Sequence, residues 1–115
     1  MADFKKIQSY IEEYRQKAID LALKIWEYAE ISYQEYQSAQ AMKDLLMEEG
    51  FAIEENLAEI PTAFKAAFSV GTGRPVMGLL AEYDALDGLS QKKDSLVQTP
   101  IVPGGCGHGC GHNLL

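Results

Sequence analysis

The sequence is poor in the residues that mark disulfide-rich, nucleic-acid-binding or membrane proteins. It holds only two cysteines in 115 residues, too few for the disulfide framework of a small secreted domain. Lysine and arginine number 10 against 17 aspartates and glutamates, which gives a net charge of -7. This balance argues against a nucleic-acid partner, because such a partner favours a basic face. No apolar run approaches the roughly 20 residues that cross a bilayer.

The beginning of the chain has no basic segment followed by an apolar stretch, so we expect no signal peptide. Hydrophobic residues make up 47% of the sequence and charged residues 23%, a composition typical of globular proteins. The length suits one domain or part of a larger one. Together these features predict a soluble, cytoplasmic protein.

The first half of the sequence predicts two amphipathic helices. Apolar residues recur at steps of three and four over 7–29, after Asp3, which can act as an N-cap. Ser32 and Glu35 have the spacing of a capping box, which predicts that a second helix begins directly after Ser32. Gly50 stands where a left-handed residue commonly ends a helix, so we expect the second helix to end there.

From residue 51 the pattern changes to that of strands. Apolar and polar residues alternate over 51–57 and more clearly over 64–70, which predicts a sheet with one solvated face. The segment 76–81 carries no charge, which is typical of a strand buried on both faces. Residues 82–112 have no clear period and predict a long loop, which in compact domains is usually functional or disordered. The predicted fold class is α/β, with two helices, mixed sheet strands and a long metal-ligand loop.

The stretch 103–113 concentrates the residues that bind metals. It holds both cysteines, Cys106 and Cys110, both histidines, His108 and His112, and five of the ten glycines. Thiolate and imidazole bind zinc readily, and glycine lets the backbone fold tightly between them. The two cysteines could instead form a small disulfide loop. A closed structural zinc site takes four ligands, so either further ligands come from elsewhere or the loop binds no metal.

Two carboxylates, Glu82 and Asp84, follow the predicted buried strand directly. In open α/β sheets ligands bind beyond the carboxyl ends of strands. Residues two apart in an extended segment point to the same side, so both carboxylates would face one point. They could orient a metal-bound histidine, or Asp84 could cap the following turn. The spacing alone does not decide between these roles.

Two motifs, Gly78–Gln91 and Gly107–Leu115, resemble in their order the M20 family of metallopeptidases and amidohydrolases. Within that family they are most similar to the branch that acts on p-aminobenzoyl-glutamate, and Ile31–Glu35 and Ile60–Phe64 are similar to it as well. The resemblance implies a catalytic domain of mixed sheet and helices that binds two divalent ions, zinc or manganese. It also implies hydrolysis of an amide bond in N-acyl amino acids, and a smaller lid domain that usually carries the dimer contact.

The resemblance implies roles for individual residues of this chain. Cys110 and His112 match the two metal ligands of the family's Cys-Gly-His motif, and Asp84 matches a carboxylate beside the metals. Apart from the resemblance, the positions of Glu82 and His108 in the sequence make both candidates for places beside the metals, and His108 could instead be a packing residue. The family usually has proline where this chain has Asp87, which changes the turn.

The resemblance also implies that part of the family's active site is absent from residues 1–115. The Glu-Glu pair of the family, which supplies the general base and a ligand, cannot be placed in this sequence, so we expect no catalytic residue here. We therefore expect residues 1–115 to be the N-terminal portion of the catalytic domain, inactive alone and part of a homo- or hetero-oligomer. The competing hypothesis is a non-catalytic α/β interaction module that pairs through an exposed sheet edge.

Overall fold

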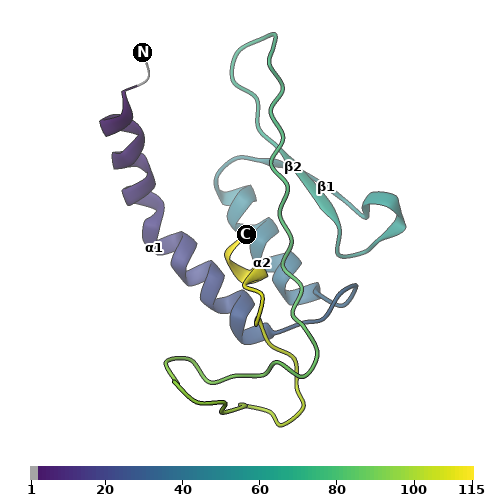
Figure 1. Cartoon of the computed structure of the whole chain (residues 1–115). Coiled ribbons are helices and arrows are strands. Elements are labelled where there is room, and N and C mark those ends of the chain that lie inside the picture. Colours follow the sequence, from purple (N-terminus) through teal and green to yellow (C-terminus); the bar gives the residue numbers. More distant parts are fainter. Residues whose placement is uncertain (1–2) are drawn as a thin grey trace.

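A computed structural model describes residues 3–115 of the chain (Figure 1). Two α-helices come first, followed by a two-stranded antiparallel sheet and a long irregular segment. The elements are α1 (Phe4–Tyr28), α2 (Tyr36–Glu48), β1 (Ala52–Glu55), β2 (Phe64–Ala67) and the short 3-10 helices η1 (Leu57–Glu59) and η2 (His112–Leu114). This arrangement confirms the predicted α/β class. Over the described residues, no helix combines the length and the apolar character needed to cross a membrane.

The helix α1 begins as the sequence predicts. The Asp3 carboxylate accepts hydrogen bonds from the backbone amides of Lys5 and Lys6, at 3.2 and 3.4 Å, and so satisfies donors that the first turn leaves free. At the other end Ala29 adopts a left-handed conformation, and its amide donates to the Ile25 carbonyl. The helix therefore has a defined start and a defined end.

The core of the chain is small and lies where the end of α1 meets α2. The buried apolar side chains are those of Ile25, Ala39 and Ala85. Ile7 and Ile11 belong to the same apolar stripe as Ile25, yet they are exposed. The reason is geometric, since α1 has 25 residues and α2 has 13, so α1 extends past its antiparallel neighbour (Figure 1).

The helix α2 begins later than predicted because a different side chain caps it. The Glu30 carboxylate accepts hydrogen bonds from the amides of Gln37 and Ser38, both at 2.9 Å, and from the Ser38 hydroxyl at 2.8 Å. Burial acts to raise the pKa of Glu30, but these hydrogen bonds outweigh it and hold the pKa below its ordinary value. The predicted capping box is wrong, because Glu35 makes no capping hydrogen bond and Ser32 bonds elsewhere.

The end of α2 and the hairpin after it follow the prediction more closely. Gly50 has a φ of +86°, the left-handed conformation expected there. In the hairpin Ala52 lies opposite Ala67, and Glu55 lies opposite Phe64. Both strands contact α2. The sheet is antiparallel, so the expectation of a mixed sheet is not met by these two strands.

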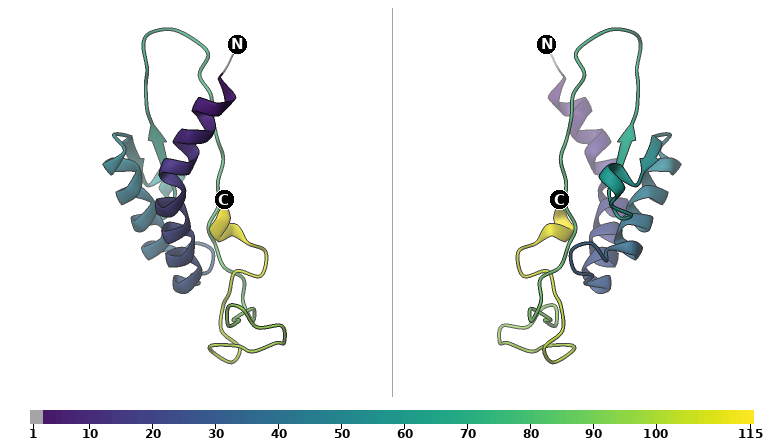
Figure 2. Two further views of the ribbon diagram at one scale, coloured as in Figure 1. Left: turned by 90° about the vertical axis from the view of Figure 1, so that its left-hand side faces the viewer. Right: turned by 90° about the vertical axis from the view of Figure 1, so that its right-hand side faces the viewer.

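The segment 76–81 is not a strand in this structure. Leu79 and Leu80 are 98% and 103% exposed, and no backbone hydrogen bond joins the segment to any other part of residues 3–115. The prediction of a strand buried on both faces is therefore wrong. An apolar composition suits burial, but a strand also needs neighbours that pair with its amides and carbonyls. Figure 2 shows this segment running as an extended trace past the helices.

Three segments that are far apart in the sequence meet just after the C-terminal end of α1. The Ala85 amide donates to the Glu30 carbonyl at 2.7 Å, which joins residues 30–32 to residues 84–86. Leu86 and Gly107 then exchange two backbone hydrogen bonds, of 3.0 and 2.9 Å. The glycine- and cysteine-rich loop is thereby fixed beside the two carboxylates and the connection between α1 and α2.

Candidate metal centre

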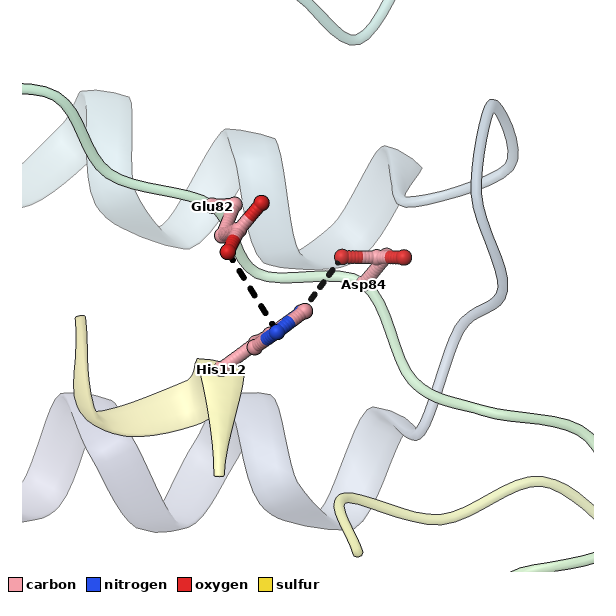
Figure 3. Close-up of side chains that lie close together, drawn as sticks. All are labelled: Glu82, Asp84 and His112. Carbon is pink, nitrogen blue, oxygen red and sulfur yellow. Dashed lines mark hydrogen bonds and ion pairs between the residues drawn. The ribbon is translucent and has the colours of Figure 1, made fainter. Parts of the chain in front are cut away.

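Three side chains that can bind a metal converge from two distant segments: Glu82, Asp84 and His112 (Figure 3). The Nδ1 atom of His112 lies 2.7 Å from Asp84 Oδ1, and its Nε2 atom lies 3.3 Å from Glu82 Oε1. One potential ligand atom from each residue lies within 4.8 Å of the others. The prediction that Glu82 and Asp84 share one side of an extended segment is confirmed.

The charges in this cluster support one another. The hydrogen bond to Asp84 raises the pKa of His112, and the nearby negative charge of Glu82 acts in the same direction. The pKa of Asp84 is lowered, first by the Ser32 hydroxyl and also by His112. The two carboxylates and one imidazole together form an anionic site in which a cation is stabilised.

Ser32 is a member of this site that the sequence patterns do not predict. Its hydroxyl donates to Asp84 Oδ2 at 2.6 Å across 52 residues of sequence. Serine, aspartate and histidine together suggest a hydrolase triad, but the order of contacts is wrong. In a triad the hydroxyl bonds to the imidazole that takes its proton, whereas here it bonds to the carboxylate. The pairing of Ile31 with Ala85 brings Ser32 and Asp84 together. This pairing is visible only in the folded structure, so no sequence pattern indicates the contact.

Tyr83, between the two carboxylates, anchors their segment from the opposite side. Its hydroxyl donates to the Thr62 carbonyl, and the Thr62 hydroxyl donates to Glu35 at 2.8 Å. Burial raises the pKa of Tyr83 to about 12, and the negative charges of Glu35 and Glu30 act in the same direction. Since side chains alternate along an extended segment, this anchor turns Glu82 and Asp84 toward His112. The polar residues Thr62 and Glu35 are buried.

His108 lies outside the cluster. Its Nε2 atom lies 3.0 Å from the carbonyl oxygen of Ile25 in α1. Burial lowers the pKa of His108 and so favours the neutral ring, which donates from Nε2 to that carbonyl. Its Nδ1 atom is buried and has no hydrogen-bond partner among the described residues. The structure therefore gives His108 a packing role, one of the two alternatives expected for it.

The chain is similar in sequence to two other proteins. It is 45% identical over 112 residues to one subunit of the p-aminobenzoyl-glutamate hydrolase of Escherichia coli (strain K12), a match that spans 97% of this chain and 23% of that protein. It is also 28% identical over 109 residues to thermostable carboxypeptidase 1 of Saccharolobus solfataricus. This second match spans 95% of this chain and 27% of that protein. No protein-family model matches the chain.

This chain is similar to a hydrolase subunit. The similarity to the Escherichia coli p-aminobenzoyl-glutamate hydrolase confirms the resemblance that the motifs at 78–91 and 107–115 indicate. The chain spans only about a quarter of the length of either relative.

Cys110, the other predicted ligand, is exposed and is not a member of the Glu82, Asp84 and His112 cluster. Gly111, between Cys110 and His112 in the sequence, has a φ of +91°. Both cysteines of the chain are free thiols, so the alternative of a disulfide loop is not realised. The thiol of Cys106 faces the Asp87 carboxylate at 3.9 Å. A role for Cys110 as a ligand stays a prediction.

The donor atoms of the cluster fit a divalent cation. Imidazole nitrogen and carboxylate oxygen are both ligands that zinc and manganese accept. A metal-binding imidazole commonly donates its other ring N–H to a carboxylate. Asp84 holds Nδ1 of His112 in this manner, so Nε2 is the nitrogen that can bind a metal in place of its proton. Glu82 lies beside that nitrogen, where it can share an ion with it.

Proposed function

We propose that this chain supplies part of the metal site of an M20-type metal-dependent amidohydrolase or peptidase. The observation that carries the proposal is the convergence of Glu82, Asp84 and His112 around one point. The similarity to one protein named a hydrolase and another named a carboxypeptidase supports the same reaction class. The negative charge of the cluster is what a cation site requires.

In this proposal each residue has a distinct task. His112 and Cys110 bind the metal, His112 through Nε2. Asp84 accepts the Nδ1 proton of His112 and so fixes the tautomer and the direction of the ring. Glu82 lies on the metal side of the ring and contributes negative charge or an oxygen ligand. Two divalent ions, zinc or manganese, would polarise the amide carbonyl of the substrate and activate water.

The described residues bring three potential ligand side chains together in one place, which is too few to enclose two ions. We therefore propose that further ligands and a general-base glutamate come from residues outside these 115, and that the chain alone does not hydrolyse amides. The proposed substrate class is N-acyl amino acids such as p-aminobenzoyl-glutamate, because the 45% identical relative carries that name. That relative is one subunit of its enzyme, so we propose that the active protein is a homo- or hetero-oligomer.

A chimera tests this proposal. The chain would be joined at Leu115 to the residues that follow the matched region in the Escherichia coli relative, and hydrolysis of p-aminobenzoyl-glutamate would be measured with zinc or manganese. We expect the chimera to be active and His112→Ala to reduce kcat/KM by at least about 100-fold. Lys93→Ala, a change in the exposed part of the loop, is the control and should retain activity. A chimera that folds but binds no divalent metal would contradict the proposal.

A second candidate function has its own observation. The segment 76–81 is apolar, extended, exposed and free of backbone partners among the described residues, which favours pairing with another chain as an added strand. Sedimentation velocity of the chain at rising concentration tests this alternative. Self-association that Leu79→Lys abolishes would support an interaction module, whereas a monomer at every concentration would exclude self-pairing.

A further inference from the structure

We propose that Ser32 is a positioning residue of the candidate metal centre: its hydroxyl orients the Asp84 carboxylate and, through it, the ring of His112. This inference rests on the proposed function and assigns a role to the connection between α1 and α2. Ser32 precedes Asp84 by 52 residues. The sequence predicts only a helix-capping role for Ser32, and the similarity to known proteins assigns it no role at a metal site.

The two oxygens of Asp84 have different partners. Oδ2 accepts the hydroxyl proton of Ser32 at 2.6 Å, and Oδ1 lies 2.7 Å from Nδ1 of His112. Both distances are typical of hydrogen bonds to an ionised carboxylate, which are stronger than neutral ones. A carboxylate held at both oxygens cannot rotate without losing one bond. Ser32 therefore fixes the orientation of the Asp84 carboxylate relative to the imidazole of His112.

The backbone holds Ser32 in place for this contact. The preceding residue, Ile31, pairs in parallel with Ala85, and the Ala85 amide donates to the Glu30 carbonyl at 2.7 Å. The Glu30 side chain is in turn bound to the first turn of α2. Ser32 thus lies on a segment that is hydrogen-bonded both to the helix α2 and to residues 84–86, which include Asp84.

The alternative role for Ser32 is to cap α2, and the contacts exclude it. The amides at the start of α2 bond to Glu30, and the only side-chain hydrogen bond of Ser32 among the described residues goes to Asp84. Removing the hydroxyl should consequently affect the metal centre and leave the helix intact. Ser38, whose hydroxyl bonds to Glu30, provides the opposite case, because its loss would loosen α2 without touching Asp84.

The test compares Ser32→Ala, Ser32→Thr, Ser38→Ala and the control Ser9→Ala, an exposed serine on α1 whose hydroxyl bonds within its own helix. Each variant is made in the chimera described above, binding of Co²⁺ to it is followed by visible absorption, and circular dichroism checks helix content. Loss of a group that orients a metal ligand typically weakens binding about 10- to 100-fold. We expect about a tenfold loss for Ser32→Ala, with affinity restored within about twofold by threonine, which keeps the hydroxyl.

A second readout needs no metal. In the metal-free chain, NMR at one fixed pH would follow the exchange of the His112 Nδ1 proton with solvent. We expect this exchange to be several-fold faster in Ser32→Ala and unchanged in Ser32→Thr, Ser38→Ala and Ser9→Ala. Equal exchange in Ser32→Ala and wild type would overturn the role of Ser32, whatever the metal data show. If no variant, wild type included, binds Co²⁺, the proposed function fails while the proton-exchange result still decides the role of Ser32.

Discussion

The imidazole of His108 lies 3.0 Å from the carbonyl oxygen of Ile25, a residue 83 positions earlier in the chain. A second bond of the same kind follows close by, since the Asn113 side-chain amide donates to the Ala22 carbonyl at 3.1 Å. Ala22 and Ile25 are three residues apart and lie on one face of α1. His108 and Asn113 stand on either side of His112 in the sequence, so α1 holds the segment that carries the imidazole at both ends.

The first prediction concerns the Asn113 anchor. Asn113→Ala removes a hydrogen bond to Ala22, a contribution of about 1 kcal/mol, and should release η2 from α1. Hydrogen exchange of the amides over 111–115 should become several-fold faster, while exchange within α2 stays the same. Gln16→Ala is the matched control, because its amide bonds only to Asp20 on the exposed face of α1. Unchanged exchange over 111–115 would show that the anchor contributes little.

The second prediction concerns the close approach of two backbone segments. A Cβ atom on Gly107 would lie 2.1 Å from the carbonyl oxygen of Leu89, which is backbone and cannot move aside easily. Gly107→Ala should therefore reduce the free energy of unfolding by about 3 kcal/mol. For Gly109→Ala, two residues on, the closest neighbour of the added Cβ is the terminal Cδ1 atom of the Leu89 side chain, at 2.6 Å, which a change of rotamer can move aside, so this change should cost under about 1 kcal/mol. Urea denaturation of both variants measures the difference, and equal losses would contradict the steric argument.

Local patterns in the sequence were sufficient for several parts of this fold. The helical period and the cap at Asp3 predict α1, because both depend on contacts within a few residues. The two-residue period of an extended segment predicts that Glu82 and Asp84 face the same side. Gly50 ends α2 as expected, because a left-handed residue there has a local steric cause.

Other parts depend on contacts between distant segments, which local patterns do not report. Ser32 and Glu35 match a capping box, yet Glu30 caps α2 and Ser32 bonds to Asp84. The period of α1 predicts an apolar face but not how much of it a neighbour covers, and Ile7 and Ile11 stay exposed. Whether an apolar segment becomes a strand depends on the presence of a pairing partner, which a local pattern cannot supply.

The third prediction tests how Asp84 supports the metal. Asp84→Asn keeps the size of the side chain but removes the negative charge that faces His112 Nδ1 at 2.7 Å. Affinity for Zn²⁺ should fall about 10- to 100-fold, measured by competition with a chelator. The control is Asp94→Asn, because Asp94 lies in the exposed part of the loop and asparagine tolerates its positive φ. Equal affinities for Zn²⁺ of the Asp84 variant and wild type would show that Asp84 does not support metal binding.

The fourth prediction is a pH dependence of loop docking in the metal-free chain. The pKa of Asp84 is lowered from 3.8, so its contribution to stability is present above pH 3.8 and is lost as the pH falls through the lower value. The pKa of His112 is raised from 6.5, so its contribution is fully present below pH 6.5 and is lost as the pH rises through the higher value. The loop should thus dock most strongly between pH 3.8 and pH 6.5, the ordinary pKa values of Asp84 and His112.

Hydrogen-exchange protection factors over 107–113 measure this dependence, and we expect them to fall from mildly acidic to alkaline pH. Metal affinity should change in the opposite direction, because a metal competes with the proton on Nε2 of His112. His112→Gln should remove the alkaline loss of protection. Protection that rises with pH in the metal-free wild type would contradict the ion pairs of His112 with Asp84 and Glu82.

The fifth prediction asks whether the exposed thiol of Cys110 joins the imidazole of His112 around the metal. Cobalt bound by a thiolate shows a strong sulfur-to-metal absorption band, so the Co²⁺ complex of the wild type should display that band and Cys110→Ser should lose it. Affinity should fall as well, because a serine hydroxyl is a poor ligand for a borderline-soft cation. Cys106→Ser is the matched control, since the Cys106 thiol faces Asp87 at 3.9 Å and has no ligand role in the proposal. A band that survives in Cys110→Ser and disappears in Cys106→Ser would assign the ligand role to the other thiol of the loop.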